Sequence, residues 1–318
     1  MSTISSRRGH SPTRNQSVPN HTRHSARTAD DLRPLKCVGN WQLTQLAGRG
    51  SFTDVYLARP LGCRPNWPAD YAVKMLRQQF NHDEVAIGVM RREAEVASQV
   101  SHQHLVAILQ AQLVDENSKY LVMPSLKGVS VAQVIAKAGY ISVRQALWIT
   151  RQVAEALGAL HRAGWLHGDI KPQNIMLSPE GHATLIDLGF ALRKSEAVLT
   201  ELRSVRGTLN YVAPETMTSA HASSDQSDIY SLGIALFEML TGRLPFEAQT
   251  PAQLIEAHRG QPLPDPRDLI DNIPDDVVRL LGRMTAKQPF RRPQDIGQLV
   301  NELLPLEVAS MNASRRAG

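Results

Sequence analysis

The chain has 318 residues, of which 42% are hydrophobic and 20% are charged, and its formal net charge is +5. This length allows one large or two modest domains with a sizeable core, and the composition is that of a soluble globular protein. The sequence has neither an apolar run near the roughly 20 residues that span a membrane nor the apolar stretch of a secretory signal. Cys37 and Cys63 lack metal-ligand spacing, so we expect two reduced thiols in a cytoplasmic protein.

The positive charge is concentrated at the N-terminus. Residues 1–38 contain seven Lys or Arg and two Asp, and this difference of five equals the net charge of the whole chain. The remaining residues therefore sum to about zero, which gives no electrostatic support for nucleic-acid binding by the folded part. Because residues 1–38 are rich in Ser, Pro, Asn and His and lack apolar periodicity, we predict a basic disordered arm. An acidic partner or a membrane surface is the alternative role for this arm.

Residues 39–126 have the pattern of a small domain that is mostly β with one helix. Apolar and polar residues alternate over 41–46, 52–59 and 70–76, and Gly48 and Gly50 turn the chain between the first two predicted strands. Residues 83–99 have helical composition. Residues 104–114 and 119–123 again have the composition of strands.

From residue 127 the composition becomes that of a mainly α-helical domain. Ser142 is positioned to cap a long amphipathic helix that ends at Gly164, and a second helix over 227–242 ends at Gly242. Shorter helical patterns continue to about residue 304. We therefore predict a helical domain over 127–305 and a frayed C-terminal tail over 306–318.

The first segment with chemical potential is Gly48-Arg49-Gly50-Ser51-Phe52-Thr53-Asp54-Val55, between two predicted strands. Glycines let the backbone approach phosphates closely and offer them N–H donors. By itself this pattern is more often a simple hairpin turn. It is also not a Walker A loop, because no Lys-Ser/Thr pair follows the second glycine.

The second segment is Ala72-Val73-Lys74, which places a lysine in an apolar strand. An ordinary lysine at a strand edge is the simplest interpretation, but a buried ammonium needs a partner. Glu93, on the next predicted helix, is the candidate, and Glu95 is its rival. The two carboxylates lie about 200° apart around a helix, so only one of them can face Lys74.

The third segment, His167-Gly168-Asp169-Ile170-Lys171-Pro172-Gln173-Asn174, is the most specific. Asp169 can accept a proton from an attacking hydroxyl, Lys171 can neutralise a phosphoryl group, and the amide oxygen of Asn174 suits a hard cation. Two short motifs follow, Asp187-Leu188-Gly189 after an apolar strand and Ala213-Pro214-Glu215. Each of these two is common by chance, so their order and spacing carry the information.

Taken together and in this order, these segments resemble the signature set of the protein kinase family, and in particular its bacterial-type Ser/Thr members, over residues 41–304. The resemblance implies an α+β, bilobal protein kinase-like fold. A small β-rich N-lobe with one helix would span 39–126, and a larger mainly α-helical C-lobe would span 127–305. It also implies ATP and Mg²⁺ as cofactors.

The resemblance implies a role for each matching residue at the phosphate end of the site. Asp169 is expected to be the catalytic base and Lys171 the γ-phosphate contact, with Asn174 and Asp187 as Mg²⁺ ligands. Lys74, paired with Glu93, is expected to contact the α- and β-phosphates, beneath a loop that contains Gly48 and Gly50.

At the adenine end, the resemblance implies that Val55, Ala72 and Met176 enclose the base and that Met123 is the gatekeeper. The Pro124 carbonyl and the Leu126 N–H are expected to bind adenine. Structural roles are implied for a Glu215–Arg292 pair, for Asp228 beneath the catalytic loop, and for Thr208 beside Asp169 and Lys171.

Two features resemble Ser/Thr kinases rather than other members of the family. These are Lys171-Pro172, directly after the expected base, and the segment Gly207-Thr208-Leu209-Asn210-Tyr211. They imply protein substrates with Ser or Thr acceptor hydroxyls.

The sequence departs from the family pattern at three positions. Thr53 replaces the third glycine of the loop, which predicts a stiffer loop and an altered ATP affinity. Leu188 replaces Phe and keeps an apolar side chain there. Gly168 replaces the Arg that receives an activation-loop phosphate. We therefore expect activity without phosphorylation of Ser195, Thr200 or Ser204.

Two alternative functions stay open. Small-molecule phosphotransferases of the aminoglycoside and choline kinase type also carry His-Gly-Asp, but they lack Lys171-Pro172 and a segment like 207–215. A pseudokinase scaffold is the non-enzymatic alternative, but such proteins have usually lost the lysine, the base or the metal-binding Asp, whereas this chain has Lys74, Asp169 and Asp187.

Overall fold

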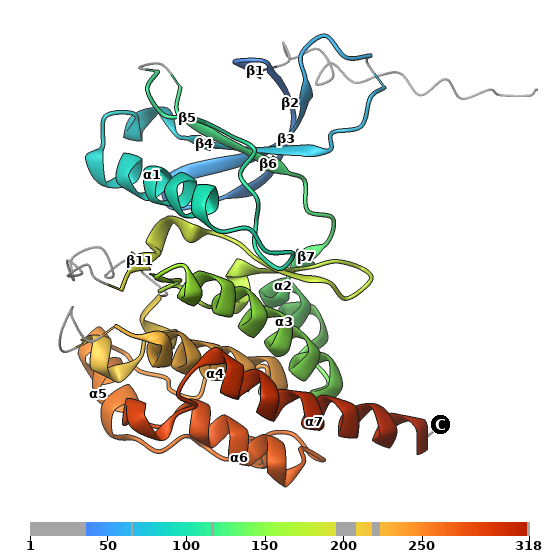
Figure 1. Ribbon diagram of the computed structural model, residues 1–318, viewed down its shortest axis with the longest axis vertical. Helices are drawn as coiled ribbons and strands as arrows, with labels where there is room; N and C mark the ends of the chain where they lie inside the picture. Colours follow the sequence, from blue (N-terminus) through green and yellow to red (C-terminus); the bar gives the residue numbers. More distant parts are fainter. Residues whose placement is uncertain (1–35, 65, 116–117, 195–207, 218–222, 317–318) are drawn as a thin grey trace, which may run out of the picture. The chain divides into compact units, whose positions relative to one another are not determined.

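The computed structural model describes residues 36–64, 66–115, 118–194, 208–217 and 223–316. Contacts divide the chain into residues 1–35 and 36–318, and only the second unit contains described residues. Nearly all of the predicted basic arm, and Ser195, Thr200 and Ser204, therefore lie outside the described residues. The described part consists of a β-rich lobe with one long helix and a larger helical lobe, which confirms the predicted two-lobe fold (Figure 1).

The N-lobe is built on a six-stranded sheet in which all neighbouring strands are antiparallel. The three strands predicted first are present as β2 (Trp41–Arg49), β3 (Thr53–Pro60) and β4 (Tyr71–Leu76). The strand order is β1-β2-β3-β4-β6-β5, with β1 at Cys37–Val38, β5 at Gln110–Gln112 and β6 at Tyr120–Pro124. Because β4 is central, Lys74 is held between two paired strands.

Helix α1 (Glu84–Gln99) packs against this sheet (Figure 1). Asp83 caps it by accepting hydrogen bonds from the N–H groups of Val85 and Ala86, at 2.9 and 3.0 Å. Its buried face, which includes Met90, joins a cluster with Leu76 of β4. This packing fixes the rotation of α1 about its axis, and therefore decides which polar side chains point inward.

The prediction of a continuous strand over 104–114 was wrong except for three residues. Only Gln110–Gln112 forms a strand. Leu105 makes an isolated parallel bridge with Leu185, and Leu105 and Val106 are buried in the core of the helical lobe. These apolar residues pack against the other lobe instead of pairing within the sheet, and composition alone does not distinguish the two outcomes.

The C-lobe is organised around α4 (Asp225–Thr241), which is buried on nearly all sides. A helix that is apolar all round is expected at the centre of a domain. It ends at Gly242, whose φ of +71° suits glycine and whose Cβ position would collide with the Gly139 carbonyl oxygen. The helices around it are α2 (Val131–Ala138), α3 (Val143–Arg162), α5 (Pro251–Gly260), α6 (Asp275–Met284) and α7 (Ile296–Arg316).

Short strands at the upper end of the C-lobe carry the segments singled out in the sequence. β9 (Ile175–Leu177) pairs with β10 (Ala183–Leu185) and with β7 (Val129–Ser130). β8 (Trp165–Leu166) pairs with β11 (Leu192–Arg193). The loops between these strands therefore present residues 167–174 and 186–191 toward the N-lobe.

The expected frayed tail over 306–318 is helical up to Arg316, because α7 continues through Pro305. Glu307 is buried and accepts a hydrogen bond from Arg151 of α3, at 2.6 Å. Packing on α3 and this ion pair stabilise a segment whose polar sequence had suggested disorder.

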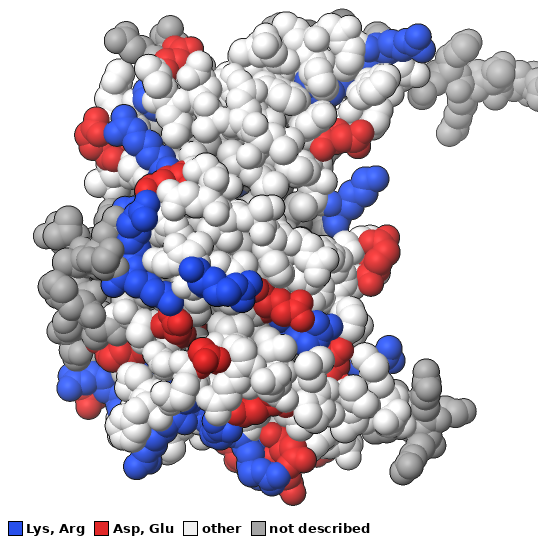
Figure 2. Space-filling view, in the orientation of Figure 1, with Lys and Arg blue, Asp and Glu red and all other residues white. Residues whose placement is uncertain are grey.

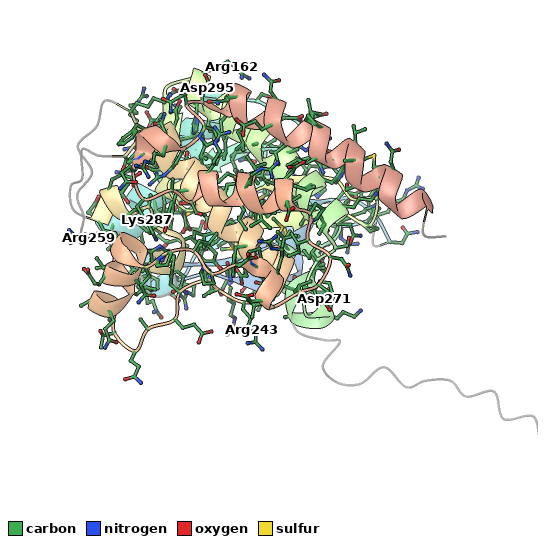
Figure 3. The ribbon with its side chains drawn as sticks, turned by 90° about the horizontal axis from the view of Figure 1, so that it is seen from below. Arg162, Arg243, Arg259, Asp271, Lys287 and Asp295 are labelled. Atoms are coloured by element: carbon green, nitrogen blue, oxygen red, sulfur yellow. The ribbon has the colours of Figure 1, made fainter. Side chains whose placement is uncertain are left out.

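Charged side chains lie on the visible face of the helical lobe (Figure 2). On the face in Figure 2, basic and acidic residues are interspersed over the described part of the C-lobe. Seen from below, Arg243, Arg259 and Asp271 lie on the helical lobe, and none of them lines the cleft described next (Figure 3). No helix among the described residues combines the length and the apolar character needed to cross a bilayer.

Candidate active site

A cleft of about 350 Å³ lies between the sheet and the C-lobe. It is bounded above by the β2–β3 loop and by β4, and below by β9 and the start of the segment after β10. All ten residues that the sequence assigned to nucleotide binding line it: Gly48, Gly50, Val55, Ala72, Lys74, Glu93, Met123, Pro124, Leu126 and Met176. Asn174 and Asp187, assigned to metal binding, line it as well.

Lys74 is the cation at the back of the cleft. Its Nζ donates to Glu93 Oε2 at 2.6 Å and to Asp187 Oδ1 at 3.0 Å. Burial alone would lower the pKa of Lys74, but the charges of Asp187 and Glu93 outweigh it and raise the pKa above its ordinary value. Lys74 is therefore charged at neutral pH, as a contact for anionic phosphates requires.

The structure resolves the ambiguity between Glu93 and Glu95. The Glu93 side chain is 1% exposed and points inward to Lys74. Glu95, two residues later, faces outward and pairs with Arg193 of β11 at 2.6 Å. The difference follows from the rotation of α1 that its apolar face imposes.

Asp169 and Asn174 form one hydrogen-bonded unit in the loop after β8. The Asn174 amide nitrogen donates to the Asp169 carbonyl oxygen at 2.8 Å and to Asp169 Oδ2 at 2.9 Å. Lys171 Nζ lies 3.0 Å from Asp169 Oδ1 and 2.8 Å from Oδ2. These contacts use the nitrogen of the Asn174 amide, so its oxygen is the atom suited to a cation. Asn174 lines the cleft, whereas Asp169 and Lys171 do not. Asp169 lies beside the cleft because it is hydrogen-bonded to Asn174, and Lys171 lies beside Asp169.

The backbone of this loop is fixed from below by Asp228 of α4. Asp228 accepts hydrogen bonds from the N–H groups of His167 at 2.9 Å and Gly168 at 3.0 Å, and from His161 at 2.8 Å. Burial alone would raise the pKa of Asp228, but its hydrogen bond with His161 and neighbouring charge lower it, so it remains an anionic acceptor.

Gly168 suits this backbone better than a larger residue would. Its φ is +74°, and a Cβ there would lie 2.9 Å from the Phe190 carbonyl oxygen. Residues with side chains rarely adopt a positive φ. The departure from the family pattern at this position therefore removes backbone strain as well as a cationic side chain.

Asp187 enters the cleft near the start of the segment that follows β10. It is one of two described non-glycine residues with positive φ, at +67°. The preceding N–H, of Ile186, donates to the Asn174 carbonyl oxygen at 2.9 Å, which holds the two proposed metal ligands next to each other. Burial favours a raised pKa for Asp187, but the charge and hydrogen bond of Lys74 lower it, so the carboxylate is ionised.

Three residues or pairs were expected to have structural roles around the site. Leu188 is 1% exposed and packs into the C-lobe core, as its apolar character predicted. The Glu215–Arg292 pair is confirmed as a two-pronged contact at 2.7 and 2.8 Å. The structure describes the backbone of Thr208 but not its side chain, so the predicted contact with Asp169 and Lys171 stays a prediction.

Sequence reasoning missed several residues of the site. Leu57, Val106, Gln173 and Ile186 line the cleft. Gln173 and Ile186 each adjoin a residue that was singled out, and Leu57 is two positions from Val55 on the same strand face, so strand alternation would have found it. Val106 comes from a segment that was predicted as strand, and nothing in its local sequence indicates that it reaches the cleft.

Comparison with known proteins agrees with this geometry. The model of the protein kinase domain family matches residues 41–304. The chain is 32% identical over 254 residues to serine/threonine-protein kinase PrkC of Bacillus subtilis (strain 168), covering 80% of this chain and 38% of that protein. It is 33% identical over 271 residues to serine/threonine-protein kinase PknH of Mycobacterium tuberculosis (strain H37Rv), covering 85% and 42%.

The chain thus spans about two fifths of the length of the curated relatives that it matches. The family match covers most of this chain and includes both lobes and every segment that forms the cleft. The chain therefore belongs to the protein kinase domain family.

Proposed function

We propose that this chain is an ATP-dependent protein kinase that transfers the γ-phosphoryl group of Mg·ATP to Ser or Thr hydroxyls of protein substrates. One observation carries the proposal. A charged lysine (Lys74), a candidate base (Asp169) and two oxygen donors suited to a cation (Asn174, Asp187), far apart in the sequence, lie at one cleft.

For the nucleotide, the cleft offers an apolar end and a charged end. Val55 and Ala72 from the sheet and Met176 from β9 enclose the adenine in our assignment, with Met123 at the back. The backbone of Pro124 and Leu126 supplies its hydrogen bonds. At the charged end, Lys74 contacts the α- and β-phosphates, and Glu93 keeps Lys74 in place.

The donor set fits Mg²⁺. Magnesium prefers hard oxygen ligands, usually one or two from protein side chains, with phosphate oxygens and water completing its shell. The Asp187 carboxylate and the Asn174 amide oxygen are such ligands. When bound, Mg²⁺ would neutralise charge on the phosphate oxygens.

Asp169 is the residue assigned to the acceptor. Its carboxylate orients the Ser or Thr hydroxyl and accepts the proton that leaves when the oxygen bonds to phosphorus. Lys171, 2.8 Å from that carboxylate, neutralises charge on the phosphoryl group in transfer. The bond to the departing ADP oxygen breaks as the bond to the acceptor oxygen forms, so the protein supplies positions and charges without a covalent intermediate.

Protein acceptors are supported by Lys171-Pro172, by the segment that leads to Glu215, and by the names of the relatives. In that segment the Tyr211 hydroxyl donates to Glu238 of α4 at 2.6 Å, which anchors it on the C-lobe. A cytoplasmic site of action is part of the proposal, because ATP is required and neither Cys37 nor Cys63 forms a disulfide. An acidic partner for residues 1–38 remains a proposal from their charge alone.

The experiment is incubation of the purified chain with Mg·[γ-³²P]ATP and either a generic basic protein or a panel of small alcohols. We expect label on Ser and Thr of the protein and none on the alcohols. Label on an alcohol alone would support a small-molecule phosphotransferase of the aminoglycoside or choline type. Absence of both transfer and ATP hydrolysis would support a pseudokinase scaffold.

A further inference from the structure

Arg77, three residues after Lys74, reaches from the end of β4 to the tip of the glycine-rich loop. Its Nη2 donates to the Gly50 carbonyl oxygen at 3.1 Å and also to the Ser51 carbonyl oxygen. Its backbone N–H donates to the Phe52 carbonyl oxygen at 2.9 Å. One residue therefore holds three consecutive carbonyl groups of the loop that overhangs the cleft.

Aromatic contacts reinforce this connection. The Phe52 ring, at the tip of the loop, meets the edge of Phe80 with centroids 5.3 Å apart. The Arg77 guanidinium lies over the same Phe80 ring, 5.2 Å from its centroid. The Gly50 N–H also donates to the Thr53 carbonyl oxygen at 2.7 Å, which closes the tip. The loop is thus held by both its backbone and its aromatic side chain.

In the described part of the chain, the guanidinium of half-buried Arg77 binds backbone carbonyl oxygens and not a carboxylate. Among the described residues it forms no ion pair with a carboxylate, and its buried Nε has no hydrogen-bond partner. Its hydrogen bonds go to neutral backbone oxygens of the loop instead. The Arg77 guanidinium therefore stabilises the conformation of the loop and does not neutralise a neighbouring carboxylate of the described residues.

The planarity of the peptide bond links these carbonyls to the nucleotide. In a trans peptide the C=O and the N–H point in opposite directions. Holding the Gly50 and Ser51 carbonyls at Arg77 therefore turns the N–H groups of Ser51 and Phe52 away from it. Within the described residues these two N–H groups have no partner, so they remain available to donate hydrogen bonds to phosphate oxygens.

We propose that Arg77 is a positioning residue for the nucleotide phosphates, because it fixes the loop 48–53 in its binding conformation before the nucleotide arrives. This inference rests on the proposed function. Preorganisation removes a cost of ordering that binding would otherwise include. It also compensates for Thr53, since a loop held from outside depends less on a third glycine for its conformation.

The test is the affinity of adenosine, ADP and Mg·ATP, measured by calorimetry for the wild type and for Arg77→Met. We expect unchanged adenosine affinity, and a loss that grows with the number of phosphates to about three- to tenfold for Mg·ATP. Equal losses for all three ligands would indicate a general structural role and would overturn the proposal, as would no loss at all.

Two further variants separate loop positioning from simple attraction of charge. Arg77→Lys keeps the charge but not the planar fork, so we expect it to bind Mg·ATP more weakly than the wild type. Wild-type affinity in Arg77→Lys would show that only charge matters and would refute the proposal. The matched control is Arg91→Met, which removes an exposed cation of α1 that does not touch the loop and should leave all three affinities unchanged.

Hydrogen exchange of the nucleotide-free protein gives an independent readout. Peptides that cover residues 48–53 should exchange faster in Arg77→Met, while peptides from α3 should not change. If Arg77→Met does not fold, Phe80→Leu keeps the guanidinium, removes the ring contact, and should give a smaller loss with the same dependence on phosphates. If the wild type does not bind Mg·ATP, the result contradicts the proposed function itself and not only the role of Arg77.

Discussion

Glu93 and Glu95 lie two residues apart on the same helix, and each is 2.6 Å from a cation, but their surroundings differ. The Glu93 side chain is 1% exposed and meets Lys74, which is 12% exposed. Glu95 is 39% exposed and meets Arg193, which is 38% exposed. An identical distance therefore describes two different interactions, because water screens the second pair and hardly reaches the first.

The comparison also separates two roles of α1. Its inner side brings a carboxylate to the lysine of the nucleotide cleft. Its outer side reaches β11, where the Arg193 guanidinium also lies 4.4 Å from the ring centroid of buried Trp165. We expect the inner contact to control catalysis and the outer contact to contribute little.

Asp187→Asn should have the largest effect. It removes the anionic oxygen that contacts Lys74 and is assigned to Mg²⁺, so phosphoryl transfer should fall by about 10³-fold or more. The measurement is incorporation of ³²P into a generic basic protein. Asp271→Asn, on the far part of the helical lobe, is the matched control and should retain wild-type activity (Figure 3). Activity of Asp187→Asn near the wild type would remove Asp187 from the mechanism.

Asp169→Asn should lower turnover by about 10²- to 10³-fold and change ATP affinity little, because the base acts on the acceptor and not on the nucleotide. Steady-state kinetics combined with calorimetry separates the two quantities. The opposite pattern, weakened ATP binding with normal turnover, would show that the role assigned to Asp169 is wrong.

Glu93→Gln and Glu95→Gln test the comparison itself. Removing one partner of a buried ion pair lowers the free energy of unfolding by about 3–5 kcal/mol, whereas an exposed ion pair contributes about 0–1 kcal/mol to it. We therefore expect Glu93→Gln to lower kcat/KM for ATP by about 10- to 100-fold, and Glu95→Gln to lower it by less than about threefold. Equal losses in both variants would show that the exposed pair at Arg193 also holds α1 in place.

The smallest effect is expected from the triple variant Ser195→Ala, Thr200→Ala and Ser204→Ala. With Gly168 in place of the family's arginine, a phosphate between residues 189 and 213 lacks one of its main cationic partners. Kinase activity should stay within about twofold of the wild type. Loss of most activity in a variant that still unfolds cooperatively would contradict this expectation.

The fold was predictable where local pattern and tertiary packing agree. Strand alternation placed β2, β3 and β4, and the caps at Ser142 and Gly242 placed the ends of α3 and α4. Prediction failed where a distant partner decides the structure. Leu105 packs on the C-lobe instead of extending a strand, and Glu307 extends α7 through its pair with Arg151.

The site likewise has features that the sequence predicted and features that it did not. The motifs predicted many of the residues that line the cleft, because the order and spacing of several segments constrain one another. They did not predict the contact of Arg77 with the loop carbonyls or the positive φ of Asp187. A side chain that binds neutral backbone has no complementary charge in the sequence that would reveal it. A positive φ is more common for aspartate than for most residues, but most aspartates do not adopt it, so the residue type alone does not predict it.

The most direct test of the account is mass-spectrometric mapping of phosphosites on an added basic protein after incubation with Mg·ATP and the purified chain, beside Asp187→Asn. We expect phosphoserine and phosphothreonine with the wild type and neither with the variant. Equal modification by both proteins, or none by the wild type under conditions in which it binds Mg·ATP, would contradict it.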